Sequence, residues 1–126
     1  MARDMARALD ALNEEIKEVA DWFEAQGLRV RAHVPLPSGG AVAWGKAGSA
    51  WEILSVGPDG QESALTSASI ARRLEAAAYV ADLLEEARRA QALKVVDVEA
   101  AVTALRALRT GAAPALPSVP ELGARP

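Results

Sequence analysis

Apolar residues recur at a helical period over the first part of the chain. Between residues 4 and 26 their spacing alternates between four and three, in the set Met5, Leu9, Leu12, Ile16, Val19 and Phe23. This spacing predicts an amphipathic helix with a narrow apolar seam, and Gly27 stands where a left-handed cap residue is expected. Such a seam suits a helix that lies on a sheet or one that pairs with its copy in a dimer, and its length leaves both open.

The period changes to two after Gly27. Apolar and cationic residues alternate in the order Leu28, Arg29, Val30, Arg31, Ala32, His33 and Val34. The alternation predicts a strand with one apolar and one cationic face. Pro35 and Pro37 cannot donate to a ladder, so we expect the strand to end there.

A hairpin is predicted over residues 41–56. A two-residue loop at 47–48 would place Trp44 directly opposite Trp51. The sequence Gly-Pro-Asp-Gly at 57–60 is typical of a tight turn, and a short strand near residues 62–65 would follow it. The sheet therefore has three or four strands.

Two helices are predicted after the sheet. Thr66 or Ser67 can cap the first, whose apolar stripe consists of Ile70, Leu74, Ala77, Ala81 and Leu84. The run Leu-Lys-Val-Val after Gln91 interrupts that stripe. Asp97 is the expected N-cap of the last helix and Gly111 its end. The apolar face of this helix consists of Val98, Ala101, Val102, Leu105 and Leu108.

These elements predict a single α+β domain over residues 1–111. It comprises an N-terminal helix, an antiparallel three- to four-stranded meander and two C-terminal helices, with the first and second helices on one face of the sheet. Residues 112–126 form a Pro-rich tail in which prolines recur every third residue, a polyproline II spacing. A disordered and a docked tail both stay open.

Composition narrows the class of protein. The chain has no cysteine, which excludes a disulfide framework, a thiolate zinc site and a cysteine nucleophile. It has no apolar run near the roughly 20 residues of a bilayer span and no signal-peptide core. We therefore expect a cytoplasmic protein. Residues 1–27 hold seven Asp and Glu against three Lys and Arg, and this acidic first helix argues against non-specific nucleic-acid binding.

The sequence contains no recognisable catalytic constellation. His33 is the only histidine, and its cationic neighbours would repel a metal cation. Nucleophile-elbow, Walker and dinucleotide-binding motifs are missing, and the carboxylates lie mostly on outer helix faces. We expect a non-enzymatic protein with no catalytic residue, metal site or cofactor.

Two sets of residues are candidates for binding. The candidates for a protein interface are Trp22, Trp44, Trp51, Phe23 and Ile16, because tryptophan is enriched at interfaces. If the helices cover the sheet face that carries Leu54, the hairpin tryptophans are left for the third helix, the tail or a partner. The candidates for a nucleic-acid surface are Arg29, Arg31, His33 and Lys46, which could form a basic sheet face beside an aromatic ring. A small-molecule site between sheet and helices is a third hypothesis.

Residues 43–86 carry a recurring motif. It reads Trp-x-Lys, a short turn, Trp-x-Leu/Ile, a Gly turn, then Leu-x-x-Ala-Ser and an Arg-bearing, alanine-rich helix, and it falls here on Trp44, Lys46, Trp51, Ile53, Leu65, Ala68, Ser69 and Arg72. In this motif the chain resembles a group of small uncharacterised proteins encoded by bacteriophages and prophages. The resemblance implies an accessory protein that binds host or phage proteins, and it implies no activity.

The order of elements is similar to two further groups. Nucleoid-associated proteins of the YbaB/EbfC type share the order helix, three strands, helix, although their Met/Lys/Gln-rich first helix is absent here. Small acidic secretion chaperones are similar in part but carry more strands. We expect a protein-interaction module that forms a homodimer. The alternative is a dimeric nucleic-acid-binding protein of nucleoid-associated type that uses the Arg29, Arg31 and Lys46 sheet face.

Overall fold

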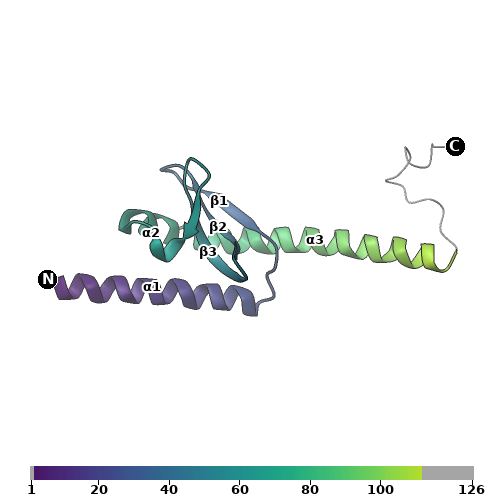
Figure 1. Ribbon diagram of the computed structural model, residues 1–126, viewed down its shortest axis with the longest axis horizontal. Coiled ribbons are helices and arrows are strands. Elements are labelled where there is room, and N and C mark those ends of the chain that lie inside the picture. Colours follow the sequence, from purple (N-terminus) through teal and green to yellow (C-terminus); the bar gives the residue numbers. More distant parts are fainter. Residues whose placement is uncertain (1, 112–126) are drawn as a thin grey trace. The chain divides into compact units, whose positions relative to one another are not determined.

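The computed structural model describes residues 2–111 of the chain. Its elements are α1 (Ala2–Ala25), β1 (Ala32–Pro35), β2 (Ala41–Ala47), β3 (Ala50–Val56), β4 (Glu62–Ala64), the 3-10 helix η1 (Leu65–Ser67), α2 (Ile70–Ala77) and α3 (Val80–Arg109). The strands pair antiparallel in the order β1-β2-β3-β4, and the first three are labelled in Figure 1. The α+β class and the fourth strand are therefore confirmed. The predicted tail, 112–126, lies outside the described residues.

Within α3 the chain divides into two compact units, one ending at Gln91 and the other beginning at Ala92. The first unit holds α1, the sheet, α2 and the start of α3. The second begins with the remaining turns of α3.

The hydrophobic core lies between the helices and the sheet face that carries Trp44. The Trp44 side chain is fully buried, and its ring centroid lies 5.0 Å from that of Phe23 on α1. A buried aromatic side chain removes about 150–250 Å² of surface from water, so this pair forms the centre of the core. The other elements contribute Val42, Ile53, Leu65, Ala76, Leu83 and Ala87.

The seam of α1 is used only in part. Ile16 and Phe23 are buried, and Leu12 and Val19 pack against the core from its margin. Met5, near the N-terminus of the helix, keeps 57% of its surface exposed. Most of the seam therefore lies on the sheet, which is one of the two arrangements that the spacing allowed.

The predicted hairpin register is wrong by two residues. Trp44 pairs with Ile53, and Lys46 pairs with Trp51, because the loop consists of Gly48 and its successor. The favoured two-residue hairpin turns need positive φ at their first loop residue. Gly48 provides it, with φ at +68°, whereas the predicted register would require positive φ at Ala47, which an alanine tolerates poorly. A shift of two residues keeps each side chain on its face, so Trp44 and Trp51 still stack, as diagonal neighbours 5.5 Å apart.

The first strand is shorter than predicted and includes a proline. Residues 28–31 precede β1. The Gln91 carboxamide accepts from the Arg29 N–H (3.0 Å) and donates to the carbonyl of Gly27, just before this segment (2.9 Å). Pro35 ends β1 without loss because β1 is an edge strand.

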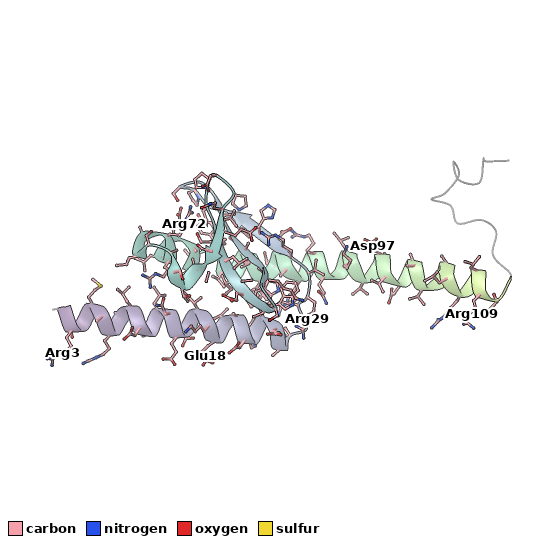
Figure 2. All side chains as sticks on the ribbon, viewed as in Figure 1. Arg3, Glu18, Arg29, Arg72, Asp97 and Arg109 are labelled. Atoms are coloured by element: carbon pink, nitrogen blue, oxygen red, sulfur yellow. The ribbon has the colours of Figure 1, made fainter. Side chains whose placement is uncertain are left out.

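The predicted boundary between the last two helices is also wrong. The helical run is interrupted at Ala78 and Tyr79, between α2 and α3. From there α3 continues without interruption past Asp97, as Figure 2 shows. The N-cap of α2 is Ser69, whose hydroxyl accepts from the Arg72 N–H (3.2 Å), whereas Thr66 and Ser67 belong to η1. The break allows α2 and α3 to approach the same core from different directions.

Candidate functional site

The structure buries three of the five candidates for a protein interface. Ile16, Phe23 and Trp44 keep at most 8% of their surface exposed. The helices cover the tryptophan face of the sheet, so these residues stabilise the fold and we correct their assignment to core residues. The Trp44 indole N–H donates to the Leu28 carbonyl (3.2 Å), so burial leaves this donor satisfied.

Trp22 and Trp51 remain at the surface. Trp22 is 45% exposed and meets Phe23 edge-on, with ring centroids 6.0 Å apart. Trp51 is half-buried, and the Lys46 ammonium lies 6.0 Å from its ring centroid, within the range of a cation–π contact. These two tryptophans stay candidates for contact with a partner.

The basic candidates do not share one sheet face. Arg29 precedes β1, and its guanidinium donates to the Glu24 carbonyl (3.1 Å). His33 pairs with Ala43 and Lys46 with Trp51, so alternation along β2 places Lys46 on the helix-covered side and His33 on the open side. The expectation of an Arg29, Arg31 and Lys46 face is therefore wrong. His33 is exposed, as a surface residue would be.

Arg31 covers part of the open sheet face. Its guanidinium forms an ion pair with Glu62 of β4. A Cβ atom at Gly45 would lie 2.6 Å from Arg31 Nη1 and 3.4 Å from Leu54 Cδ1, so the guanidinium lies directly over Gly45, with Leu54 next to the same position. Leu54 is only 2% exposed and lies outside the core cluster that the helices share with the sheet. The Arg31 guanidinium thus covers this part of the sheet while its charge is paired with Glu62.

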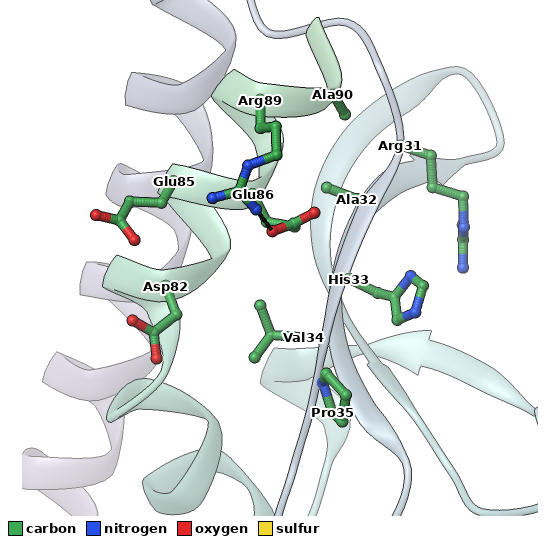
Figure 3. Close-up of a pocket in the computed structure, with 10 residues that line it drawn as sticks. All are labelled: Arg31, Ala32, His33, Val34, Pro35, Asp82, Glu85, Glu86, Arg89 and Ala90. Atoms are coloured by element: carbon green, nitrogen blue, oxygen red, sulfur yellow. Dashed lines mark hydrogen bonds and ion pairs between the residues drawn. The ribbon is translucent and has the colours of Figure 1, made fainter. Parts of the chain in front are cut away.

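A cavity of about 630 Å³ lies between β1 and the first turns of α3. Figure 3 shows the Val34 side chain directed toward α3, whereas His33 and Arg31 lie on the other side of the strand. Glu86 and Arg89 form an ion pair at its wall. Within residues 2–111, no three His, Asp or Glu side chains gather closely enough to hold a metal ion.

Glu75 fastens the loop before β2 to α2. Its carboxylate accepts from the hydroxyl and from the N–H of Ser38, the latter at 2.9 Å, and Arg72 Nη1 donates to the Gly39 carbonyl (2.7 Å). The Ser38 hydroxyl, the Ser38 N–H and the Arg72 charge hold the pKa of Glu75 below its usual value. This cluster positions the loop.

An apolar groove opens between α1 and the corner where α2 meets α3. Its volume is about 350 Å³, and it is lined by Leu12, Glu15, Ile16 and Val19 of α1, Ile53 of β3, Ala77 of α2 and Val80 of α3. Arg73 Nη1 of α2 donates to Asn13 Oδ1 of α1 (2.8 Å), which ties the two helices together. The groove is large enough to keep the small-molecule hypothesis open.

Sequence reasoning identified both walls of this groove but not the groove itself. Leu12 and Val19 belong to the predicted seam, and Ala77 to the predicted stripe of the second helix. The sequence did not indicate the interruption at residues 78–79, which divides one predicted helix into α2 and α3 and places an angle between them. No glycine or proline marks that break.

No protein-family model matches the chain, and no match was found among curated proteins or solved structures. None of the helices in the part of the chain that the structure describes is both long and apolar enough to cross a membrane.

Proposed function

We propose that the protein is a non-enzymatic interaction module that binds a partner protein in the groove between α1 and the α2–α3 corner. The observation that carries this proposal is the apolar lining of the groove, in which Glu15 is the one charged residue. Small-molecule sites combine an apolar lining with a few precisely placed polar groups that fix the ligand. A lining with one carboxylate instead suits a partner that contributes apolar side chains.

Exposed apolar residues continue the groove along both walls. Met5 lies seven residues before Leu12, and Leu74 lies three residues before Ala77, so each falls on the same helix face as its groove residue. Both are more than half exposed, Met5 at 57% and Leu74 at 58%. Removing such side chains from water on binding contributes about 25 cal/mol per Å².

These features favour an amphipathic helix as the bound element. A helix-in-groove partner presents apolar anchors at positions i, i+3 or i+4, and i+7. Basic residues beside those anchors would meet Glu15 and the acidic outer face of α1, where Glu18 points away from the sheet (Figure 2).

The proposal extends to the biological context of the protein and its compartment. The resemblance of residues 43–86 to phage-encoded proteins supports an accessory role in a phage or prophage, with a host or phage protein as the partner. The absence of cysteine favours the cytoplasm.

The test begins with affinity capture from a lysate of the native host, with and without residues 112–126, followed by reconstitution of the captured protein with the purified chain. Ala77 is exposed and lines the groove, so Ala77→Arg places a long charged side chain at its mouth. We expect at least about tenfold weaker binding by calorimetry, the effect of losing one interface anchor.

Ala71→Arg is the matched control, because it makes the same change on an exposed position of α2 outside the groove lining. It should bind like the unmodified chain. Equal affinities of the two variants would contradict the groove assignment.

A further inference from the structure

The last turns of α3 carry an apolar seam in the second unit of the chain. Four of the large apolar side chains between residues 92 and 109 recur at spacings of three, four and three: Val95, Val98, Val102 and Leu105. All four are exposed, from 38% at Val102 to 60% at Leu105. Ala101 and Leu108 flank the seam on the same face. The helix therefore presents a continuous apolar stripe along its axis.

The spacing of the stripe is that of a two-stranded coiled coil. If Val95 occupies an a position, Val98 is d, Val102 is a and Leu105 is d. β-branched residues at a with leucine at d favour two parallel strands over higher oligomers. Both a positions here are valine, and the second d position is leucine.

We propose that residues 92–109 pair with the same segment of a second copy as a parallel, in-register two-stranded coiled coil. This association is separate from the proposed binding of a partner in the groove, which lies entirely within residues 1–91. Four apolar layers form, each from the same residue of the two copies. Arg109 follows at the next a position and ends the apolar stripe.

Charges beside the seam favour the parallel orientation. Lys94 falls at g and Glu99 at the following e position, five residues later. In a parallel pair each Lys94 faces Glu99 of the second copy, which gives two attractive contacts. Neither side chain takes part in an ion pair among the described residues.

The antiparallel arrangement has the opposite electrostatics. To keep all four apolar layers it must place Val98 against Val102 of the second copy. Facing positions then sum to 200, and Glu99 comes to lie beside Glu99 of the second copy. Like charges in these flanking positions are unfavourable. Charge complementarity thus selects both the second copy as the occupant and its direction.

Sedimentation equilibrium of the full chain from roughly 1 μM to 1 mM covers the range of moderate affinities. We expect the mass to double across this range. Val98→Asp should weaken the association by at least about tenfold, because it buries two facing carboxylates. Val96→Asp is the control: it makes the same change in the same helix at an exposed position off the seam. A monomer throughout, or equal effects of both substitutions, would overturn the proposal and leave groove binding untouched.

Cysteine crosslinking tests the direction. The chain has no cysteine of its own, so Val98→Cys introduces a single thiol. In a parallel pair its Cα atoms fall within disulfide range, and mild oxidation should give a covalent dimer, whereas Val96→Cys should give little. Crosslinking only in a mixture of Val98→Cys with Val102→Cys would overturn the parallel register. A swap of Lys94→Glu with Glu99→Lys should restore association that Glu99→Lys alone weakens.

Discussion

Replacing Gly45 with alanine perturbs the arginine that covers the open sheet face. The new Cβ would lie 2.6 Å from Arg31 Nη1, closer than van der Waals contact allows, and 3.4 Å from Leu54 Cδ1. The backbone at Gly45 is outside the left-handed region, so alanine fits the strand itself. The flexible end of Arg31 has to move aside, and its ion pair with Glu62 is lost.

The loss of the Arg31–Glu62 ion pair and the replacement of a glycine change the stability by similar amounts with opposite sign. The side chains of Arg31 and Glu62 are 47% and 40% exposed, so their ion pair contributes about 0–1 kcal/mol. Replacing glycine at a compatible position stabilises by about 0.4–1 kcal/mol, because the unfolded chain has less freedom to lose. We therefore expect Gly45→Ala alone to change the free energy of unfolding by less than about 0.5 kcal/mol.

A double-mutant cycle separates these contributions. In an Arg31→Ala background the clash is gone, so Gly45→Ala should stabilise by about 0.4–1 kcal/mol. Urea unfolding of the four proteins, compared through their midpoints at constant m-value, gives the coupling energy. If Gly45→Ala has the same effect in both backgrounds, the guanidinium does not lie over residue 45 and the reasoning is refuted.

Two further predictions concern charged groups. The pKa of Glu75 is lowered in the folded state, so this carboxylate contributes stability that is fully present above its ordinary pKa of 4.5 and is lost as pH falls through the lower folded-state pKa. Glu75→Gln should therefore unfold at lower urea concentration than the parent at pH 7, and the difference between the two proteins should disappear in acid. We expect no binding to duplex DNA at low salt, because Arg31 is paired with Glu62 and α1 is acidic; DNA binding that Arg29→Ala with Arg31→Ala abolishes would favour the nucleic-acid alternative instead.

Local chemistry made most elements of the fold predictable. The spacing of α1, its end near Gly27 and the turn at residues 57–60 each follow from a few neighbouring residues. The hairpin register does not, because registers that differ by two residues present the same side chains to the core. Only the need for positive φ at Gly48 separates them.

Long-range contacts determine the features of the fold that the sequence did not predict. Gln91 binds the Arg29 N–H and the Gly27 carbonyl just before β1, and it lies more than 60 residues away from both in the sequence. The burial of Trp44 depends on which sheet face the helices cover, and alternation made both faces apolar. The groove depends on the break at residues 78–79, for which the sequence carries no helix-breaking residue.

Occupation of the groove is the central claim, and methyl NMR of the full chain titrated with the purified partner tests it most directly. We predict that the methyl signals of Leu12 and Val19 shift, since both line the groove, while those of Leu54 and Val34, in the sheet, stay in place. Shifts confined to Leu54 and Val34, with Leu12 and Val19 unchanged, would contradict the account.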